Sequence, residues 1–269
     1  MKYDPIKRSL GRVFNTTPFL RILFYRMLDL LLLRTWYVKR ELRQWKVSRQ
    51  GNQFILDAGS GFGQYTWYLS GLNPSWKIMA VDVKEEQIAD CTRFFAKAGR
   101  KNVEFSVADL TVFEKPDTCD LILSVDVMEH IAEDEKVFRN FYTSLKPGGM
   151  LLISTPSDQG GSDVRDHDEE DSFIEEHVRD GYNIADIAEK LKRSGFPKVE
   201  TMYSYGRPGQ AAWRLSMKFP IGMLNASKLF FLILPFYYLL AFPVAWCLNC
   251  LDVRQRHTTG TGLIVKAWK

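Results

Sequence analysis

Short apolar segments alternate with amphipathic segments between residues 52 and 155, and this alternation restricts the possible folds more than any other feature of the chain. Strands that alternate with helices pack as right-handed βαβ units, in which helices cover both faces of a parallel sheet. A later amphipathic segment, capped by Asn183 and ended by Gly195, continues the pattern. Seven strands are expected, at 54–58, 76–83, 103–109, 120–127, 150–155, 199–205 and 261–268, with helices at 85–98, 134–145 and 184–195.

A glycine cluster follows the first strand, in the sequence FILDAGSGFGQY at 54–65. Its glycines let the backbone turn tightly and approach a ligand, and the helix after them offers N-terminal amides. The spacing differs from the GxGxxG of dinucleotide-binding sites, and the Gly-Lys-Ser/Thr of a P-loop is absent. Acidic residues at three strand ends, Asp57, Asp82 and Asp109, make the pattern more specific than the glycines alone.

These motifs, with LSVDVMEHI at 123–131 and KPGGMLLIST at 146–155, resemble the class I S-adenosylmethionine-dependent methyltransferases of the small-molecule, ubiquinone-biosynthesis-like (methyltransferase type 11-like) kind. The resemblance is close over 52–155 and looser up to residue 205 and over 261–268. It implies an α/β fold with a Rossmann-like, seven-stranded sheet, mostly parallel, whose last strand is antiparallel.

The resemblance also implies a cofactor, S-adenosyl-L-methionine, and a product, S-adenosyl-L-homocysteine. In this family the glycine loop wraps the methionine part, the acid matching Asp82 binds the ribose hydroxyls, and the acid matching Asp109 binds the adenine amino group. Ribose hydroxyls are donors to an ionised carboxylate, so the chemistry agrees with that role. The expected cofactor-binding residues are Asp57, Ala58, Gly59, Gly61, Gly63, Asp82, Val83, Asp109, Leu110, Asp126 and Val127.

Three residues are candidates for the transfer chemistry, which requires in-line positioning and, for some acceptors, a base. His130 follows the fourth strand on the cofactor side, and a structural role is an equal alternative for it. His177 and Arg179 lie where this family places acceptor-facing residues, so they are expected to take a proton and hold an anionic group. A cap or a solvated residue is the alternative for His177.

No metal site is expected. The acidic run DVRDHDEED at 163–171 is better explained as a flexible loop, because clustered metal ligands in related catechol methyltransferases come from separate strand ends. Cys247 and Cys250 form a CxxC without a second pair, so zinc is not predicted. The four cysteines have no disulfide spacing, which favours a reducing compartment.

The ends of the chain are basic and apolar, whereas the middle is acidic. Net charge is +9 over residues 1–50, −12 over 51–203 and +7 over 204–269. Residues 18–46 have the spacing of one or two amphipathic helices interrupted by arginine, so they should lie on a surface, either the protein's own or a membrane's. Basic residues beside apolar helices suit an anionic lipid surface, and the acidic middle argues against nucleic acid as a partner.

The sequence LFFLILPFYYLLAFPVAWCLNCL at 229–251 has no charged residue and is long enough to span a bilayer. A single crossing would leave the seventh strand on the wrong side of the membrane, and Pro235 and Pro243 are expected to break the segment into short helices. We therefore expect an apolar lid over the active site that dips into a membrane, with a soluble lid and a true span as alternatives. The expected basic rim is Arg207, Arg214, Lys218, Lys228, Arg254 and Arg256.

The predicted organisation is an N-terminal helical extension (1–50), a cofactor-binding domain (51–205 with 258–269) and an apolar helical insertion (206–257). The predicted function is methylation, most simply on oxygen, of a hydrophobic or lipid-linked acceptor at an anionic membrane surface. The alternatives are N- or C-methylation of a lipid and a non-catalytic membrane-binding protein. The predicted location is cytoplasmic, with peripheral association with the cytoplasmic face of a membrane.

Overall fold

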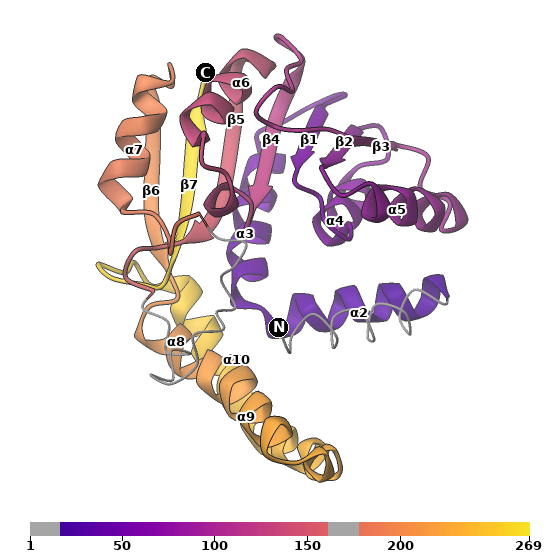
Figure 1. Cartoon of the computed structure of the whole chain (residues 1–269), viewed down its shortest axis with the longest axis vertical. Coiled ribbons are helices and arrows are strands. Elements are labelled where there is room, and N and C mark those ends of the chain that lie inside the picture. The colour runs from indigo at the N-terminus through magenta and orange to yellow at the C-terminus, as the bar shows by residue number, and fades with distance from the viewer. Residues whose placement is uncertain (1–16, 161–177) are drawn as a thin grey trace.

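A seven-stranded sheet forms the centre of the computed structural model, which describes residues 17–160 and 178–269. The strand order is β3-β2-β1-β4-β5-β7-β6 (Figure 1). All neighbouring pairs are parallel except those of β7, which is antiparallel to both β5 and β6. The strands are β1 Phe54–Ala58, β2 Lys77–Asp82, β3 Val103–Val107, β4 Cys119–Val125, β5 Leu145–Pro156, β6 Lys198–Ser204 and β7 Gly262–Trp268. The predicted fold, including the antiparallel last strand, is confirmed.

Helices cover both faces of the sheet, and each layer has its own apolar core. On one face, α3 and α4 pack on the central strands around Leu42, Leu69 and Trp76. On the other face, α6 and α7 contribute Phe138 and Leu191 to a second core. The helices of the domain are α3 Leu33–Val47, α4 Gln64–Leu72, α5 Glu85–Lys97, α6 Asp134–Ser144 and α7 Ile184–Arg193, with a 3₁₀ turn η1 at Met128–His130.

β5 begins earlier than the sequence predicts. The strand includes residues 145–149, where Pro147-Gly148-Gly149 predicts only a turn. Cys119 pairs with Leu145, and the register then shifts so that Leu121 pairs with Met150. A bulge absorbs the extra residues and lets the strand run through the glycines.

The N-terminal segment forms two helices that have different roles. α2 (Pro18–Leu31) begins at the cap residue Thr17, and α3 begins at Leu33 after an extended residue, Leu32. α3 is buried against the sheet through Tyr37 and Val38, so it lies on the protein's own surface. α2 crosses the end of the domain at which the parallel strands finish (Figure 1).

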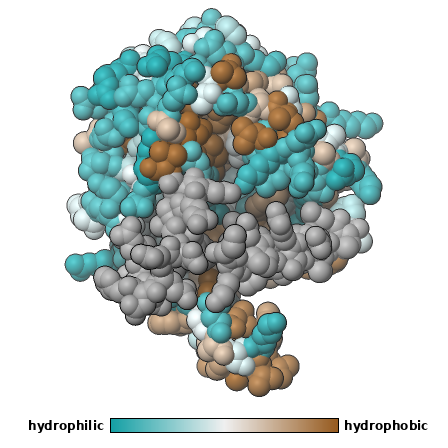
Figure 2. Space-filling view, in the orientation of Figure 1, coloured by the Kyte–Doolittle hydropathy of each residue, from teal (hydrophilic) through white to brown (hydrophobic). Residues whose placement is uncertain are grey.

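The insertion before β7 is a helical hairpin. Its outgoing leg contains α8 Arg207–Trp213, a π-helical turn η2 Arg214–Lys218, α9 Phe219–Ala226 and a 3₁₀ turn η3 Lys228–Leu232, and its return leg is α10 Leu234–Arg254. Figure 1 shows the hairpin extending away from the sheet, and Figure 2 shows apolar residues gathered at its tip. The hairpin therefore does not form the lid that was expected over the active site, although its legs start and end beside the sheet.

The prediction that prolines divide the apolar segment is right at Pro235, where η3 ends and α10 begins, and wrong at Pro243. Pro235 lies in the first turn of α10, where no intrahelical amide donor is required, and Pro243 lies inside the continuous helix. In the part of the chain that the structure describes, α10 is the one helix long and apolar enough, by length and composition, to cross a membrane. Membrane association stays a prediction at this point.

Candidate cofactor and acceptor site

The glycine loop lies at the carboxyl end of β1, beside β4, where the strand order reverses. In open α/β sheets this crevice is where ligands bind. Gly59, Gly61 and Gly63 all have left-handed backbone angles, with φ of +83°, +53° and +83°. The amides of Gly59 and Ser60 both donate to the Val81 carbonyl of β2, at 2.8 and 2.9 Å, which ties the loop to the neighbouring strand.

Asp57 supports this loop from within the protein. It is almost fully buried at the end of β1 and accepts a 2.5 Å hydrogen bond from the Thr66 hydroxyl of α4. Burial raises its pKa to about 7, the hydrogen bond from Thr66 opposes the rise, and the nearby Asp82 carboxylate adds to it. Asp57 therefore holds the start of α4 in place beneath the loop.

The other two acids stand at successive strand ends, as predicted. Asp82 accepts hydrogen bonds from the amides of Gly61 and Lys84, each at 2.9 Å, so it shapes the glycine loop and faces it. Asp109 is exposed after β3 and accepts from the Thr111 amide at 2.8 Å. An ionised carboxylate accepts about four hydrogen bonds, so both retain capacity for a ligand.

The residues fit S-adenosylmethionine. A Cβ added at Gly61 would meet no protein atom closer than 3.9 Å, which leaves its Cα open to a ligand. Beside it, the Ser60 hydroxyl is buried without a hydrogen-bond partner among residues 17–160 and 178–269. Val83 is exposed beyond Asp82, whereas Ala58 and Leu110 are buried and act as supports. These groups provide polar contacts and an open cradle.

Two residues of α2 grip the glycine loop, a contact that the sequence did not predict. Arg21 Nη2 donates to the Phe62 carbonyl at 2.7 Å, and the Tyr25 hydroxyl donates to the same oxygen at 2.5 Å. Arg21 also pairs with Asp90 of α5, and its Nε donates to the Tyr25 hydroxyl at 2.8 Å. Both side chains are buried. α2 therefore supports the glycine loop directly.

A second group of polar side chains surrounds Arg34, at the start of α3. Its guanidinium pairs with Asp126 at the end of β4, and its amide donates to the Tyr205 hydroxyl at 3.0 Å. Asp126 and Tyr205 have unusual left-handed angles for non-glycine residues, with φ of +53° and +54°. Such angles store strain and are typical of functional sites. Tyr65 of α4 completes the group, and burial raises the pKa of both phenols while Arg34 opposes the rise.

His130 lies in the 3₁₀ turn after Asp126 and Val127, as predicted, and is partly exposed. Its neighbour Glu129 is buried, accepts from the Thr155 hydroxyl at 3.1 Å, and has a pKa raised by burial, with His130 and Arg34 among the groups that oppose the rise. The sequence motif makes His130 the first candidate base, and Glu129 is its neighbour in the same motif. The structure brings both close to the end of β4.

Arg179 is held by protein atoms. Its guanidinium donates to the Met128 carbonyl at 3.1 Å, contacts the Tyr182 hydroxyl and pairs with Asp134 at 2.8 Å. These contacts anchor the segment after residue 178 to the turn after β4, and they do not support the prediction that Arg179 holds an anionic acceptor. His177 and the acidic run 163–171 lie outside the described residues. Within the described ranges, no cluster of three His, Cys, Asp or Glu side chains is arranged to hold a metal ion.

The fold and the site define a class I S-adenosylmethionine-dependent methyltransferase. A family model described as "Methyltransferase domain" matches residues 50–198. The match covers more than half of the chain, which therefore belongs to this methyltransferase family. The family and cofactor predicted from the sequence are confirmed.

Curated relatives share this domain. A phosphoethanolamine N-methyltransferase of Triticum aestivum is 33% identical over 149 residues, which is 55% of this chain and 28% of that protein. A malonyl-[acyl-carrier protein] O-methyltransferase of Bacillus anthracis is 34% identical over 101 residues, which is 38% of this chain and 36% of that protein. The chain thus spans about a third or less of the length of these relatives.

Solved structures share the fold at lower identity. Phosphoethanolamine N-methyltransferase 2 of Haemonchus contortus, in complex with S-adenosyl-L-methionine, has a TM-score of 0.60 at 20% identity. The alignment covers 91% of this chain and 60% of that one. A [4+2]-cyclase, SpnF, has a TM-score of 0.57 at 17% identity, so this fold also serves another reaction.

Proposed function

We propose that this chain transfers a methyl group from S-adenosylmethionine to an amine-bearing, lipid-linked acceptor at an anionic membrane surface. In this chemistry the acceptor nitrogen forms a bond to the methyl carbon, the carbon–sulfur bond breaks to leave a thioether, and any proton released from the nitrogen passes to water or a base. The role of the chain is to hold donor and acceptor in line and to exclude water.

The hairpin is the observation that carries the membrane part of this proposal. Residues 219–251 contain one charged residue, Lys228, and most large apolar side chains of α10 are exposed. At 1.5 Å per residue α10 is about 31 Å long, close to the hydrocarbon thickness of about 30 Å. Both legs join the same sheet, so a re-entrant hairpin places the whole domain on one side of the membrane.

Basic residues lie at the base of the hairpin and along the first part of its outgoing leg, and we call this set the basic collar. The outgoing leg places its first basic residues within α8 and η2, and the return leg ends in two arginines. Cations at this level meet anionic lipid head groups when the apolar tip is inserted. The collar consists of Arg207, Arg214, Lys218, Arg254 and Arg256. Lys228, also expected in the basic rim, lies instead in η3, at the far end of the outgoing leg.

The acceptor atom is proposed from the relatives. Oxygen was the expectation from sequence, but several curated relatives are named phosphoethanolamine N-methyltransferases, which favours nitrogen. The matched O-methyltransferase keeps oxygen as a second candidate. A soluble phosphoethanolamine-like amine is the alternative substrate, and the exposed hairpin favours a lipid-linked one.

The first test is methyl transfer from tritiated S-adenosylmethionine to vesicles of phosphatidylethanolamine and phosphatidylglycerol, compared with soluble phosphoethanolamine. We expect radioactivity in the organic extract, with mass spectrometry locating the methyl group on nitrogen. Asp82→Ala, which removes the acceptor of the Gly61 amide, is expected to abolish the signal. Transfer to soluble phosphoethanolamine alone, or to an oxygen, would contradict the proposal.

A further inference from the structure

α2 has two opposite faces, one buried against the domain and one exposed. Arg21 and Tyr25, on the inner face, are only 2% and 1% exposed and bind the carbonyl of Phe62 in the glycine loop. On the outer face, apolar residues follow helical spacing and remain in solvent. These outer residues are Phe19, Leu23, Met27 and Leu30, which are 72%, 40%, 44% and 44% exposed.

We propose that the outer face of α2 binds an anionic bilayer surface and that this contact strengthens cofactor binding through the Arg21 and Tyr25 clamp on the Phe62 carbonyl. The inference rests on the proposed function, because the hairpin brings the domain to the membrane. It adds a second contact that acts on the cofactor site. Arg21 and Tyr25 are then positioning residues, since they act on the cofactor through the glycine loop.

Charge on and around α2 favours an anionic lipid surface as the occupant of the outer face. The single acid of α2, Asp29, is turned inward, where it pairs with Lys39 and accepts from Gln64 Nε2 at 2.9 Å. The outer face of α2 therefore presents no carboxylate of its own, and Arg26 of the same helix is exposed. α2 and the hairpin lie beyond the same end of the sheet (Figure 1), so one surface can meet both.

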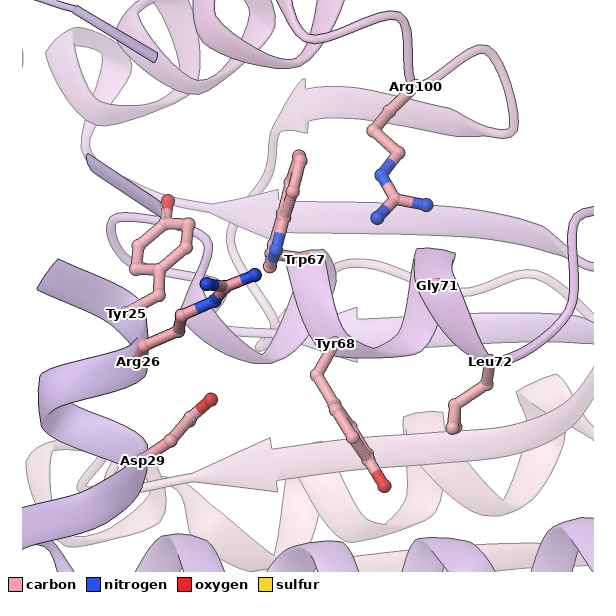
Figure 3. Close-up of a pocket in the computed structure, with 8 residues that line it drawn as sticks. All are labelled: Tyr25, Arg26, Asp29, Trp67, Tyr68, Gly71, Leu72 and Arg100. Carbon is pink, nitrogen blue, oxygen red and sulfur yellow. The ribbon is translucent and has the colours of Figure 1, made fainter. Parts of the chain in front are cut away.

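Between the contacts that hold α2 to the domain, the packing beneath the helix leaves a pocket. This pocket, of about 230 Å³, lies between α2 and α4 and is lined by Tyr25, Arg26 and Asp29 on one side and by Trp67 and Tyr68 on the other (Figure 3). An extended residue, Leu32, joins α2 to α3 and allows a change of angle between them. A membrane that holds the outer face reduces this freedom.

The coupling follows from linkage. In the docked position of α2, Arg21 and Tyr25 contact the Phe62 carbonyl. If lipid binds this position more tightly than other positions, lipid raises the affinity for the cofactor. The cofactor then raises the affinity for lipid by the same factor. The clamp fixes a carbonyl within the loop, so its loss changes the positions of the neighbouring amides. Couplings between sites in proteins typically reach about fivefold or more.

The test measures the dissociation constant of S-adenosylhomocysteine by calorimetry, with phosphatidylglycerol vesicles, with phosphatidylcholine vesicles and without vesicles. For the intact chain we expect anionic vesicles to lower the constant about fivefold. Leu23→Ser combined with Met27→Ser should still pellet with vesicles through the hairpin but lose this response. The matched control, Val47→Ser, removes an exposed apolar side chain on α3 and should keep it.

Tyr25→Phe tests the clamp with a minimal change. The variant keeps the outer face and the ring but lacks the hydroxyl that binds the Phe62 carbonyl. We expect it to pellet like the intact chain and to show a reduced response of cofactor affinity to anionic vesicles. A full response in Tyr25→Phe would overturn the clamp.

The outcomes separate this inference from the proposed function. If the intact chain does not pellet with anionic vesicles, both fail. If it pellets and the dissociation constant does not change, the coupling is wrong and the hairpin proposal stands. A third outcome is that the intact chain is a dimer, that the Leu23→Ser, Met27→Ser variant is a monomer, and that vesicles do not change the dissociation constant of S-adenosylhomocysteine. The outer face then binds a second copy of the chain, and the inference is overturned.

Discussion

Individual residues set the shape of the cofactor loop through backbone angles that most side chains avoid. Gly59 is the most constrained of them, because its φ is +83° and an added Cβ would lie 2.2 Å from a methyl carbon of Val127. Val127 is itself a predicted cofactor contact at the end of β4. The glycine therefore lets the loop and the turn after β4 approach each other.

Gly59→Ala is expected to destabilise the protein and abolish cofactor binding. The left-handed angle costs about 1–2 kcal/mol for an L-residue, and the clash with Val127 adds about 1–3 kcal/mol. The matched control is Gly148→Ala, because Gly148 has a φ of +76° and a Cβ added there would meet no atom within 4 Å. Urea unfolding and calorimetry with S-adenosylhomocysteine compare the two. Equal losses in both variants would show that the angle alone, and not the contact with Val127, matters.

At the same scale, Arg34 links residues that the sequence treats separately. Its guanidinium neutralises Asp126 and its amide meets Tyr205, so the ends of β4 and β6 are joined through the N-terminal helices. The sequence shows Arg34 only as an interruption of an apolar helix. No local pattern identifies a partner in another element, which is why this part of the site was not predicted.

Among the elements, α10 is the one whose attachment decides the direction of the hairpin. Near its end, Asp252 is fully buried and accepts from the Tyr37 hydroxyl at 2.7 Å and from the Gly209 amide at 2.8 Å. His257 Nε2 lies 3.3 Å from the same carboxylate. One side chain thus joins both legs of the hairpin to α3.

Asp252→Ala is expected to loosen the base of the hairpin. It leaves the buried Gly209 amide without its acceptor, at a cost of about 1–3 kcal/mol. The Tyr37 hydroxyl keeps the Asp252 backbone carbonyl as an acceptor at 2.9 Å. Tyr37→Phe removes the hydroxyl and costs about 1 kcal/mol. Chemical denaturation gives the free energies of unfolding, and limited proteolysis reports whether the hairpin base opens. Similar stability of Asp252→Ala and the unchanged protein would refute this account of the anchor.

At the scale of the whole molecule, the basic residues and the exposed apolar surface lie toward the same end. The basic collar and α2 lie beyond the end of the sheet where the cofactor loops gather, and the apolar hairpin extends further in that direction (Figure 1). The acidic residues belong mainly to the central domain, which has a net charge of −12 over 51–203. On the proposed function, an anionic membrane surface attracts this end of the molecule and repels the rest, which turns the cofactor site toward the membrane.

Serine substitution of three exposed residues of α10, Phe236, Leu239 and Leu240, is expected to release the protein from anionic vesicles. Each large apolar side chain contributes about 1.5–3 kcal/mol when it leaves water, so insertion should outweigh the screened attraction of the collar. A wash with concentrated salt should accordingly leave the intact chain bound. Co-sedimentation measures both, with Val47→Ser as the control. Retention of the triple variant in the pellet would contradict insertion of α10.

The sequence by itself determined the seven strands, their order of alternation with helices, and the glycine loop with its acids at the strand ends. These features depend on short-range periodicity and on backbone freedom, which are set by residues that are neighbours in the sequence. It also determined that both ends are basic and that one long segment is uncharged. It did not determine that α10 continues through Pro243, because a proline removes one hydrogen bond but does not by itself end a long helix.

Only the tertiary structure decided how the outer helices meet the site. Whether α2 covers the glycine loop depends on the angle at Leu32 and on contacts such as that between Arg21 and the Phe62 carbonyl, 41 residues apart in the chain. The direction of the hairpin likewise depends on Asp252 and its partners on α3 and α8. Contacts between distant segments form only once the sheet and its helices are packed, so no local pattern encodes them.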